Sequence, residues 1–180
     1  AYLDSTRPIT GSRPRFIDKL PQNFQYAGFI AQALPKAKII CLRRNAMDTC
    51  IANFRQLFTM TAPTFDYSFD IMDTGRYYLM FDDLMRHWHA VMPGRILEID
   101  YEDIVDDQEA MTRKLLAHCG LDWEDACLRF EKNSAPVSTA SAVQVRSPIY
   151  RSSLGRWKRY GDELDPLRRL LVEGGVEVPA

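Results

Sequence analysis

The segment Lys38-Ile39-Ile40-Cys41-Leu42-Arg43-Arg44-Asn45-Ala46-Met47-Asp48 decides how the chain is organised. Its short apolar run is rich in β-branched residues and ends in two arginines, which favours a buried strand. Asn45 is a typical helix N-cap residue, and Asp48 follows three positions later, close to the spacing of a capping box. The segment therefore predicts a strand that leads directly into a helix.

A strand that delivers arginine to a helix N-terminus can build a site for a doubly charged anion. The helix end offers free N–H groups and a positive dipole, and a guanidinium binds phosphate through two parallel hydrogen bonds. The alternative interpretation is an ordinary strand-to-helix junction with two solvated arginines. The segment alone does not decide between these interpretations.

Size and composition limit the classes of protein to consider. The 180 residues are 46% hydrophobic, which is enough for one core and favours one domain. The net charge of −1 gives no overall basic surface for nucleic acid or anionic membranes, so an anion site must be local. No apolar run approaches the roughly 18 residues of a membrane span, and the N-terminus lacks the apolar core of a signal peptide.

The cysteines indicate a reducing compartment. All four lie in apolar strand or helix patterns, and none forms a close C-x-x-C pair. We interpret them as buried free thiols rather than disulfides, which predicts a cytoplasmic location. They are Cys41, Cys50, Cys119 and Cys127.

The rest of the chain alternates between strand and helix patterns. We expect coil over residues 1–14, a loop over 59–66 and a largely irregular segment over 133–154. The patterns predict strands at 15–20, 37–42 and 95–101, and helices at 22–34, 46–58, 67–91, 108–119, 123–132 and 164–173. Strands that alternate with helices favour a parallel sheet covered by helices.

Lys19 stands at the C-terminal end of the first predicted strand. Ligands of open α/β sheets gather outside the carboxyl ends of the strands. A lysine there can neutralise charge that develops on a transferred group. The alternative is a solvated lysine before a turn.

Residues 139–160 form a third candidate for ligand binding, after the Arg43–Arg44 junction and Lys19. They combine hydroxyls and a glycine with four arginines, one lysine and aromatic side chains. Such a segment can wrap a phosphate and stack a base. The alternative is a basic linker, although Trp157 and Tyr160 would be costly to leave exposed in one.

We expect no metal site. His87 and His89 are two positions apart on a predicted helix and so point to different faces. His118 lies near a helix end, where capping is the simpler role, and the acidic residues of 100–107 are interpreted as capping the turn after the third strand. The chain also lacks a G-x-x-x-x-G-K-[ST] phosphate loop.

Together these segments resemble the bacterial sulfotransferase family, including its tetratricopeptide-fused members and the related tyrosylprotein sulfotransferases. The resemblance runs from about Phe16 to Leu171 and rests on motifs in a fixed order. They are D-K-L-P-Q-N at 18–23, P-K-A-K-I-I at 35–40 with R-N-A-M-D-T-C at 44–50, H-W at 87–88 followed by Y-E-D at 101–103, and Q-V-R at 144–146 with P-I-Y at 148–150 and G-R-W at 155–157.

The resemblance implies both a fold and a reaction. The fold would be α/β, with a P-loop-NTPase-like three-layer arrangement of a parallel sheet covered by helices. The reaction would move a sulfuryl group from 3′-phosphoadenosine 5′-phosphosulfate to a hydroxyl or amine acceptor and release adenosine 3′,5′-bisphosphate. No metal is implied, and the partners would be the nucleotide donor and an unknown acceptor, with no nucleic acid.

The resemblance also implies roles for single residues. Arg44 would hold the 3′-phosphate of the donor. Lys19 would stabilise negative charge on the leaving phosphate, and Ser141 would reach the same phosphosulfate region. The residues that would close over the nucleotide are Arg146, Ser153, Gly155, Arg156 and Trp157.

Two departures from the family pattern shape our expectation. The position eight residues after Arg44 usually carries a serine and here is Ala52; a hydroxyl bond to a charged group contributes on the order of 1.5–3 kcal/mol. Nothing upstream of Phe16 matches the P-x-[RK]-S-G-[TS]-T loop that binds the 5′-phosphosulfate. We therefore expect residues 1–180 to form a single, partial sulfotransferase domain without its first strand and loop, and with weak or no activity.

Two alternatives remain open. One is a non-catalytic relative that binds adenosine 3′,5′-bisphosphate or a protein partner. The other is an interaction module that forms a homodimer or accepts a strand at an exposed sheet edge. The acceptor would be set by variable loops, here 59–68 and 133–139.

Overall fold

The centre of the fold is a short parallel sheet. The computed structural model describes residues 2–58, 63–133 and 144–178. Within them, β1 (Ile39–Arg43) pairs in parallel with β2 (Ile96–Asp100), so that Ile39 lies opposite Ile96 and Arg43 opposite Asp100. The parallel sheet predicted from the strand and helix pattern is thus confirmed for these two strands.

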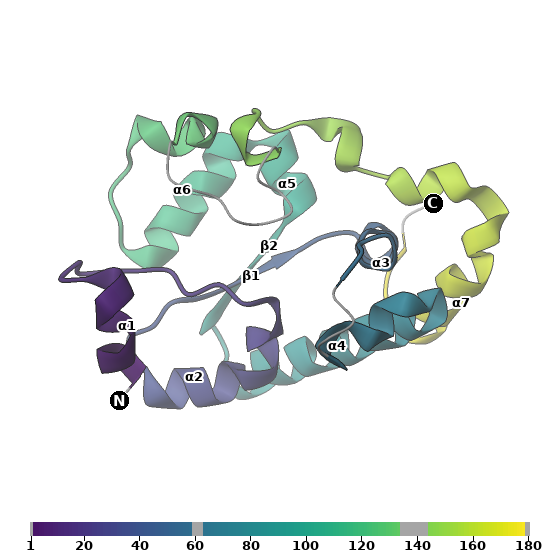
Figure 1. The fold of residues 1–180 in the computed structure, drawn as a ribbon, viewed down its shortest axis with the longest axis horizontal. Coiled ribbons are helices and arrows are strands. Elements are labelled where there is room, and N and C mark those ends of the chain that lie inside the picture. Colours follow the sequence, from purple (N-terminus) through teal and green to yellow (C-terminus); the bar gives the residue numbers. More distant parts are fainter. Residues whose placement is uncertain (1, 59–62, 134–143, 179–180) are drawn as a thin grey trace.

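Helices surround this sheet (Figure 1). In the view of Figure 1, α2 and α4 lie on one side of it, α5 and α6 on the other, and α3 and α7 beyond the end at which β1 finishes. The helices are α1 (Tyr2–Thr10), α2 (Ala27–Ala33), α3 (Ala46–Phe54), α4 (Ile71–Val91), α5 (Tyr101–Asp106), α6 (Gln108–Cys119) and α7 (Asp165–Glu173). The 3₁₀ segments are η1 (Pro21–Tyr26), η2 (Pro63–Phe69), η3 (Asp125–Leu128), η4 (Phe130–Lys132), η5 (Gln144–Arg146), η6 (Arg151–Ser153) and η7 (Arg156–Leu164).

Side-chain caps fix where the main helices begin. The Asn45 side chain accepts a hydrogen bond of 3.1 Å from the Asp48 N–H at the start of α3, as the sequence predicts. Asp70 caps α4 by accepting from the N–H groups of Met72 and Asp73 at 2.7 and 2.9 Å. This cap explains why the predicted helix over 67–91 begins only at Ile71, because the preceding residues form η2.

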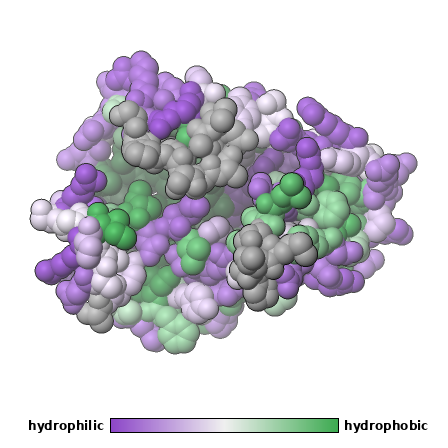
Figure 2. Space-filling model, viewed as in Figure 1, coloured by the Kyte–Doolittle hydropathy of each residue, from purple (hydrophilic) through white to green (hydrophobic). Residues whose placement is uncertain are grey.

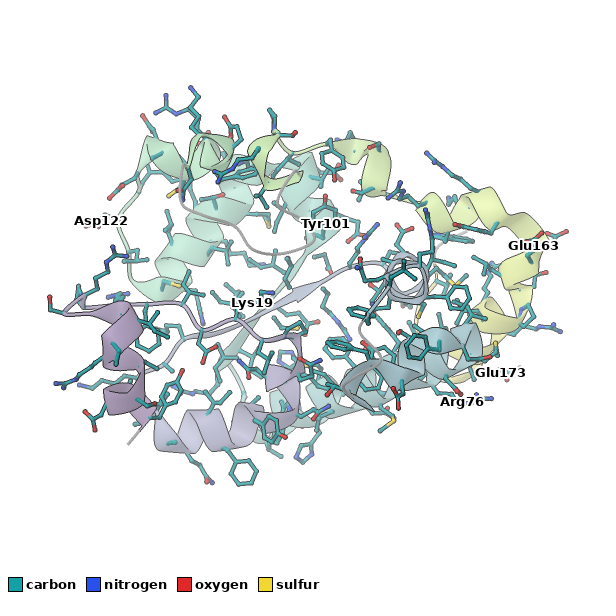
Figure 3. The ribbon with its side chains drawn as sticks, in the orientation of Figure 1. Lys19, Arg76, Tyr101, Asp122, Glu163 and Glu173 are labelled. Atoms are coloured by element: carbon teal, nitrogen blue, oxygen red, sulfur yellow. The ribbon has the colours of Figure 1, made fainter. Side chains whose placement is uncertain are left out.

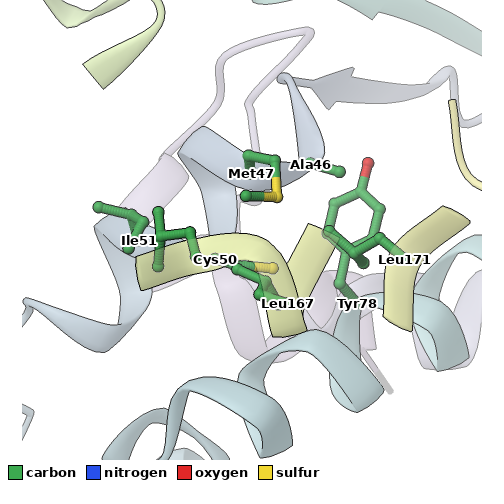
Figure 4. Close-up of a cluster of buried hydrophobic side chains, with 8 residues drawn as sticks. Ala46, Met47, Cys50, Ile51, Tyr78, Leu167 and Leu171 are labelled. Atoms are coloured by element: carbon green, nitrogen blue, oxygen red, sulfur yellow. The ribbon is translucent and has the colours of Figure 1, made fainter. Parts of the chain in front are cut away.

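One apolar core joins α3 to the C-terminal part of the chain. Met47 and Cys50 of α3 are fully buried against Leu167 and Leu171 of α7, with Tyr78 of α4 beside them (Figure 4). A second cluster packs α2 and α4 on the sheet through Ala27, Met85 and Ile96. The helix that follows β1 is therefore held mainly by contacts distant in sequence.

The strand β1 buries only one of its faces. Ile39 and Cys41 pack on the second cluster, whereas Ile40 and Leu42 are 42% and 57% exposed. Figure 2 shows apolar side chains left on the surface among charged ones. The face of β1 with Ile40 and Leu42 is as apolar as that of a strand buried on both faces, yet no other part of the described chain covers it.

Three predicted elements are wrong. Residues 2–10 form α1 instead of coil, and the Tyr2 hydroxyl donates to Asp18, which ties the start of this helix to the segment after it. Within α1 the Ser5 and Thr6 hydroxyls bond to carbonyls one turn earlier at 2.7 and 3.0 Å. The predicted strand over 15–20 pairs with no strand in the described chain. Its Arg15 instead donates to the carbonyls of Cys119 and Gly120 at the end of α6, which holds the segment there.

The predicted helix over 123–132 is replaced by η3 and η4. Backbone bonds of the i to i+3 type close both turns, from Cys127 to Glu124 at 2.9 Å and from Lys132 to Arg129 at 3.0 Å. The indole N–H of Trp123 donates to the Asp125 side chain at 2.8 Å, just before and at the start of η3. No helix of the described residues has both the length and the apolar character needed to cross a membrane.

Replacing Leu171 with alanine tests the first core. Leu171 is 0% exposed, so Leu171→Ala should lower the free energy of unfolding by about 2–5 kcal/mol in urea titration. The matched control is Leu57→Ala, because Leu57 is 93% exposed and should change stability by less than about 0.5 kcal/mol. Equal effects of the two variants would contradict this account of the core.

Candidate functional site

Arg44 lies at the junction between β1 and α3, and its guanidinium contacts three other segments. Its Nη2 donates to the carbonyl oxygen of Ser153 and lies 3.6 Å from a carboxylate oxygen of Asp48. The guanidinium also lies over the ring of Tyr101, 5.6 Å from its centroid. The side chain is 25% exposed, and its buried Nε has no hydrogen-bond partner among the described residues.

Asp48 is the buried carboxylate of this site. It is 1% exposed and stands in the first turn of α3. One of its oxygens accepts from the N–H of Gly155 at 2.7 Å and the other from the N–H of Trp157 at 3.0 Å. These bonds, with the nearby Arg44, compensate the loss of water around the charge.

Tyr101 ties the same segment to the end of β2. Its hydroxyl lies 3.1 Å from the hydroxyl oxygen of Ser153, which is nearly buried. Tyr101 is the first residue of α5 and is labelled in Figure 3. Its neighbour Glu102 accepts from the N–H of Asn45 at 2.9 Å, so the segments that follow the two strands are bonded to each other.

The two arginines of the junction have different surroundings. The Arg43 guanidinium bonds to Asp82 of α4 and, at 3.1 Å, to Glu98 of β2, and it covers the ring of Phe81 at 5.1 Å. Glu98 lies in turn 3.0 Å from Nε2 of His89. Arg43 therefore links the sheet to α4, and Arg44 is left as the arginine of the candidate site.

The structure brings four of the predicted site residues together. Arg44, Ser153, Gly155 and Trp157 meet around the N-terminus of α3, the last two through their backbone N–H groups. The Trp157 ring is partly buried against the core of α3 and α7. The segment predicted to cover a phosphate thus lies over the predicted phosphate-binding helix end.

The other predicted residues are exposed or lie outside the described residues. Lys19 is exposed on the segment between α1 and η1 (Figure 3), and no hydrogen bond or ion pair joins it to Arg44 among the described residues. Ser141 lies outside the described residues. The remaining three, Ala52, Arg146 and Arg156, are exposed.

Sequence reasoning missed the central role of Asp48 and Tyr101. The sequence identified Asp48 as a capping residue and Tyr101 as part of a turn motif. The only available signal was that both belong to motifs at strand ends, which parallel pairing brings together. Among the described residues, no group of three or more His, Cys, Asp and Glu side chains could hold a metal ion.

Comparison with known proteins identifies the family to which the chain is related. The model of a sulfotransferase family matches residues 1–125. An uncharacterised protein of Aquifex aeolicus is 41% identical over 173 residues, which cover 96% of this chain and 23% of that protein. A protein-tyrosine sulfotransferase of Drosophila melanogaster is 23% identical over 151 residues, or 80% of this chain and 30% of that protein. The chain therefore corresponds to less than a third of the length of either relative.

Two cysteines near the site are poor nucleophiles. Burial raises the pKa of Cys41 to about 11, and the neighbouring Glu98 carboxylate adds to the shift. Burial raises the pKa of Cys50 to about 12. At pH 8 only about one Cys41 in a thousand is then a thiolate, the form that reacts with alkylating reagents.

Alkylation tests this account of the thiols. At pH 8 in the native protein, Cys41 and Cys50 should stay unmodified by iodoacetamide, whereas all four cysteines should react in denaturant. Mass spectrometry of peptides measures each site, with the partly buried Cys119 and Cys127 as internal comparison. Native labelling of Cys50 as rapid as that of Cys119 would show that the first core opens.

Proposed function

Because the chain belongs to the sulfotransferase family, we propose that it binds 3′-phosphoadenosine 5′-phosphosulfate and transfers the sulfuryl group to a hydroxyl or amine acceptor. In this proposal Arg44 holds the 3′-phosphate, and the segment from Ser153 to Trp157 closes over the nucleotide. The observation that carries the proposal is the docking of this segment on Arg44 and the N-terminus of α3. The product would be adenosine 3′,5′-bisphosphate.

The surroundings of Arg44 support a phosphate site. Its side chain is three-quarters buried, so a bound dianion would be screened less by water than on an open surface. Both polar contacts of the guanidinium use Nη2, and a guanidinium has five N–H donors in a planar fork. Donors therefore remain for a phosphate, which Arg can bind through two parallel hydrogen bonds.

Lys19 and Ser141 are proposed as the residues nearest the chemistry. Sulfuryl transfer through a loose transition state is helped by positioning and by charge stabilisation, as phosphoryl transfer is. Lys19 would stabilise the negative charge on the leaving phosphate, and Ser141 would bond to the same region. Arg146 and Arg156, both exposed, would add positive charge around the nucleotide.

The same proposal extends to the fold of the whole protein and to its cellular location. We propose a P-loop-NTPase-like three-layer arrangement in the whole protein, without a metal and in the cytoplasm. The exposed Ile40 and Leu42 of β1 support further cover of the sheet, by other parts of the protein, by a second copy or by an added strand. The acceptor would be chosen by the loops around residues 59–68 and 133–139.

A second candidate function is nucleotide binding without transfer. The observation that favours it is that Lys19 is exposed and makes no hydrogen bond or ion pair with the residues around Arg44 in the described part of the chain. Incubation with sulfur-labelled donor and a panel of phenols, alcohols and amines separates the two functions. Transfer of label to any acceptor excludes the non-catalytic alternative.

Replacing Arg44 with alanine tests the phosphate site. Adenosine 3′,5′-bisphosphate should bind the wild-type chain with micromolar affinity in isothermal titration calorimetry, and Arg44→Ala should weaken binding by about tenfold or more, because a charged hydrogen bond is lost. The control is Arg168→Ala, since Arg168 is an exposed arginine of α7. Equal affinity of all three proteins would refute the role of Arg44.

Restoring a hydroxyl at position 52 tests whether the nucleotide reaches along α3. Ala52→Ser should tighten binding of the same nucleotide by about tenfold, because a hydroxyl bond to a charged group is added. Ala110→Ser introduces the same change at an exposed position of α6 and should leave the affinity unchanged. If Ala52→Ser binds the nucleotide with unchanged affinity, the phosphate does not reach the turn of α3 that contains residue 52.

A further inference from the structure

The burial of Asp48 needs an explanation, because helix capping does not require it. An acidic residue in a first helical turn is stabilised by the helix dipole while it remains in water. Asp48 is instead 1% exposed, and both of its oxygens accept hydrogen bonds from another segment. Its carboxylate is therefore directed at the segment around Gly155 rather than at its own helix.

The two oxygens of the Asp48 carboxylate match two N–H groups at the turn of residues 155–157. Gly155 has a φ of +63° and directly precedes η7, so its N–H and that of Trp157 both point out of the start of a helical turn. Such N–H groups have no partner inside a helix. Asp48 supplies acceptors for two of them, and the adjacent Arg44 bonds to Ser153 two residues before the glycine.

We infer that Asp48 is a positioning residue, whose carboxylate holds the turn at residues 155–157 against α3 and keeps the Arg44 guanidinium in place for an anionic ligand. The nucleotide part of this inference rests on the proposed function. Asp48 does not itself contact the ligand in this account. It acts through the turn and through Arg44, from which it lies 3.6 Å.

Electrostatics and positioning make opposite predictions for one isosteric variant. If the carboxylate were only a negative charge near the site, Asp48→Asn would remove a repulsion and tighten binding of a phosphate. If it positions the site, Asp48→Asn should weaken binding, because an amide replaces one of the two acceptors with a donor. The sign of the change therefore separates the two roles.

The experiment combines that affinity with a measurement that needs no ligand. Amide hydrogen exchange of the ¹⁵N-labelled chain is followed by NMR for wild type and Asp48→Asn. We expect the amides of Gly155 and Trp157 to exchange at least about tenfold faster in the variant, and adenosine 3′,5′-bisphosphate to bind about tenfold more weakly. The amide of Leu171 in α7 should keep its protection, which shows that the core is intact.

Asp107→Asn is the matched control. Asp107 caps α6 by accepting from the Ala110 N–H at 2.9 Å, so its replacement changes a helix-capping carboxylate away from the site. It should alter neither the exchange of Gly155 and Trp157 nor the nucleotide affinity.

If Asp48→Asn fails to fold, Gly155→Ala opens the turn from the other side, because alanine is strained at a φ of +63°. It should give the same faster exchange of Trp157 and the same weaker binding.

Each contrary result has a distinct meaning. Unchanged exchange of Gly155 and Trp157 in Asp48→Asn would overturn the positioning role, whatever the affinity. Faster exchange with unchanged or tighter binding would overturn the link between the turn and the ligand. If wild type does not bind the nucleotide, the proposed function fails, while the exchange comparison still decides whether Asp48 holds the turn.

Discussion

The parallel pairing of β1 with β2 is the constraint on which the candidate site depends. In this register Arg43 lies opposite Asp100, so the residues that follow each strand emerge at the same edge of the sheet. Arg44 therefore meets the Tyr101 ring, and Glu102 reaches the backbone of Asn45. An antiparallel pairing would place these two strand ends at opposite edges, and no common site would form.

Two neighbouring arginines take different roles because Arg43 is the last residue of β1 and Arg44 already lies outside the strand. Arg43 points to the face that packs on α4, where Asp82 and Glu98 neutralise it. Arg44 already belongs to the turn into α3 and lies beside Asp48 and Ser153. The site gains a cation whose position is fixed by partners on both sides, which reduces the reorganisation needed when an anion binds.

The sequence predicts the parts of this structure that local rules control. The strand at Ile39–Arg43, the Asn45 cap and the last helix agree with expectation. The failures are non-local: Arg15 is drawn to the end of α6, and the two backbone N–H groups that donate to Asp48 lie more than a hundred residues away from it. No pattern within one segment encodes such pairs. Lys19 and Ser141 remain predictions of the family resemblance.

The packing of α3 on α7 has a consequence for how the molecule forms during synthesis. Met47 and Cys50 are covered by Leu167 and Leu171, which the ribosome adds much later. Domains tend to fold as units as they emerge during translation, and the helix beside Arg44 gains the part of its packing that α7 supplies only after residue 171 has left the exit tunnel. Until then α3 can pack on Tyr78 of α4 but not on α7, so the core beside the candidate site is completed only when the C-terminal helix has been made.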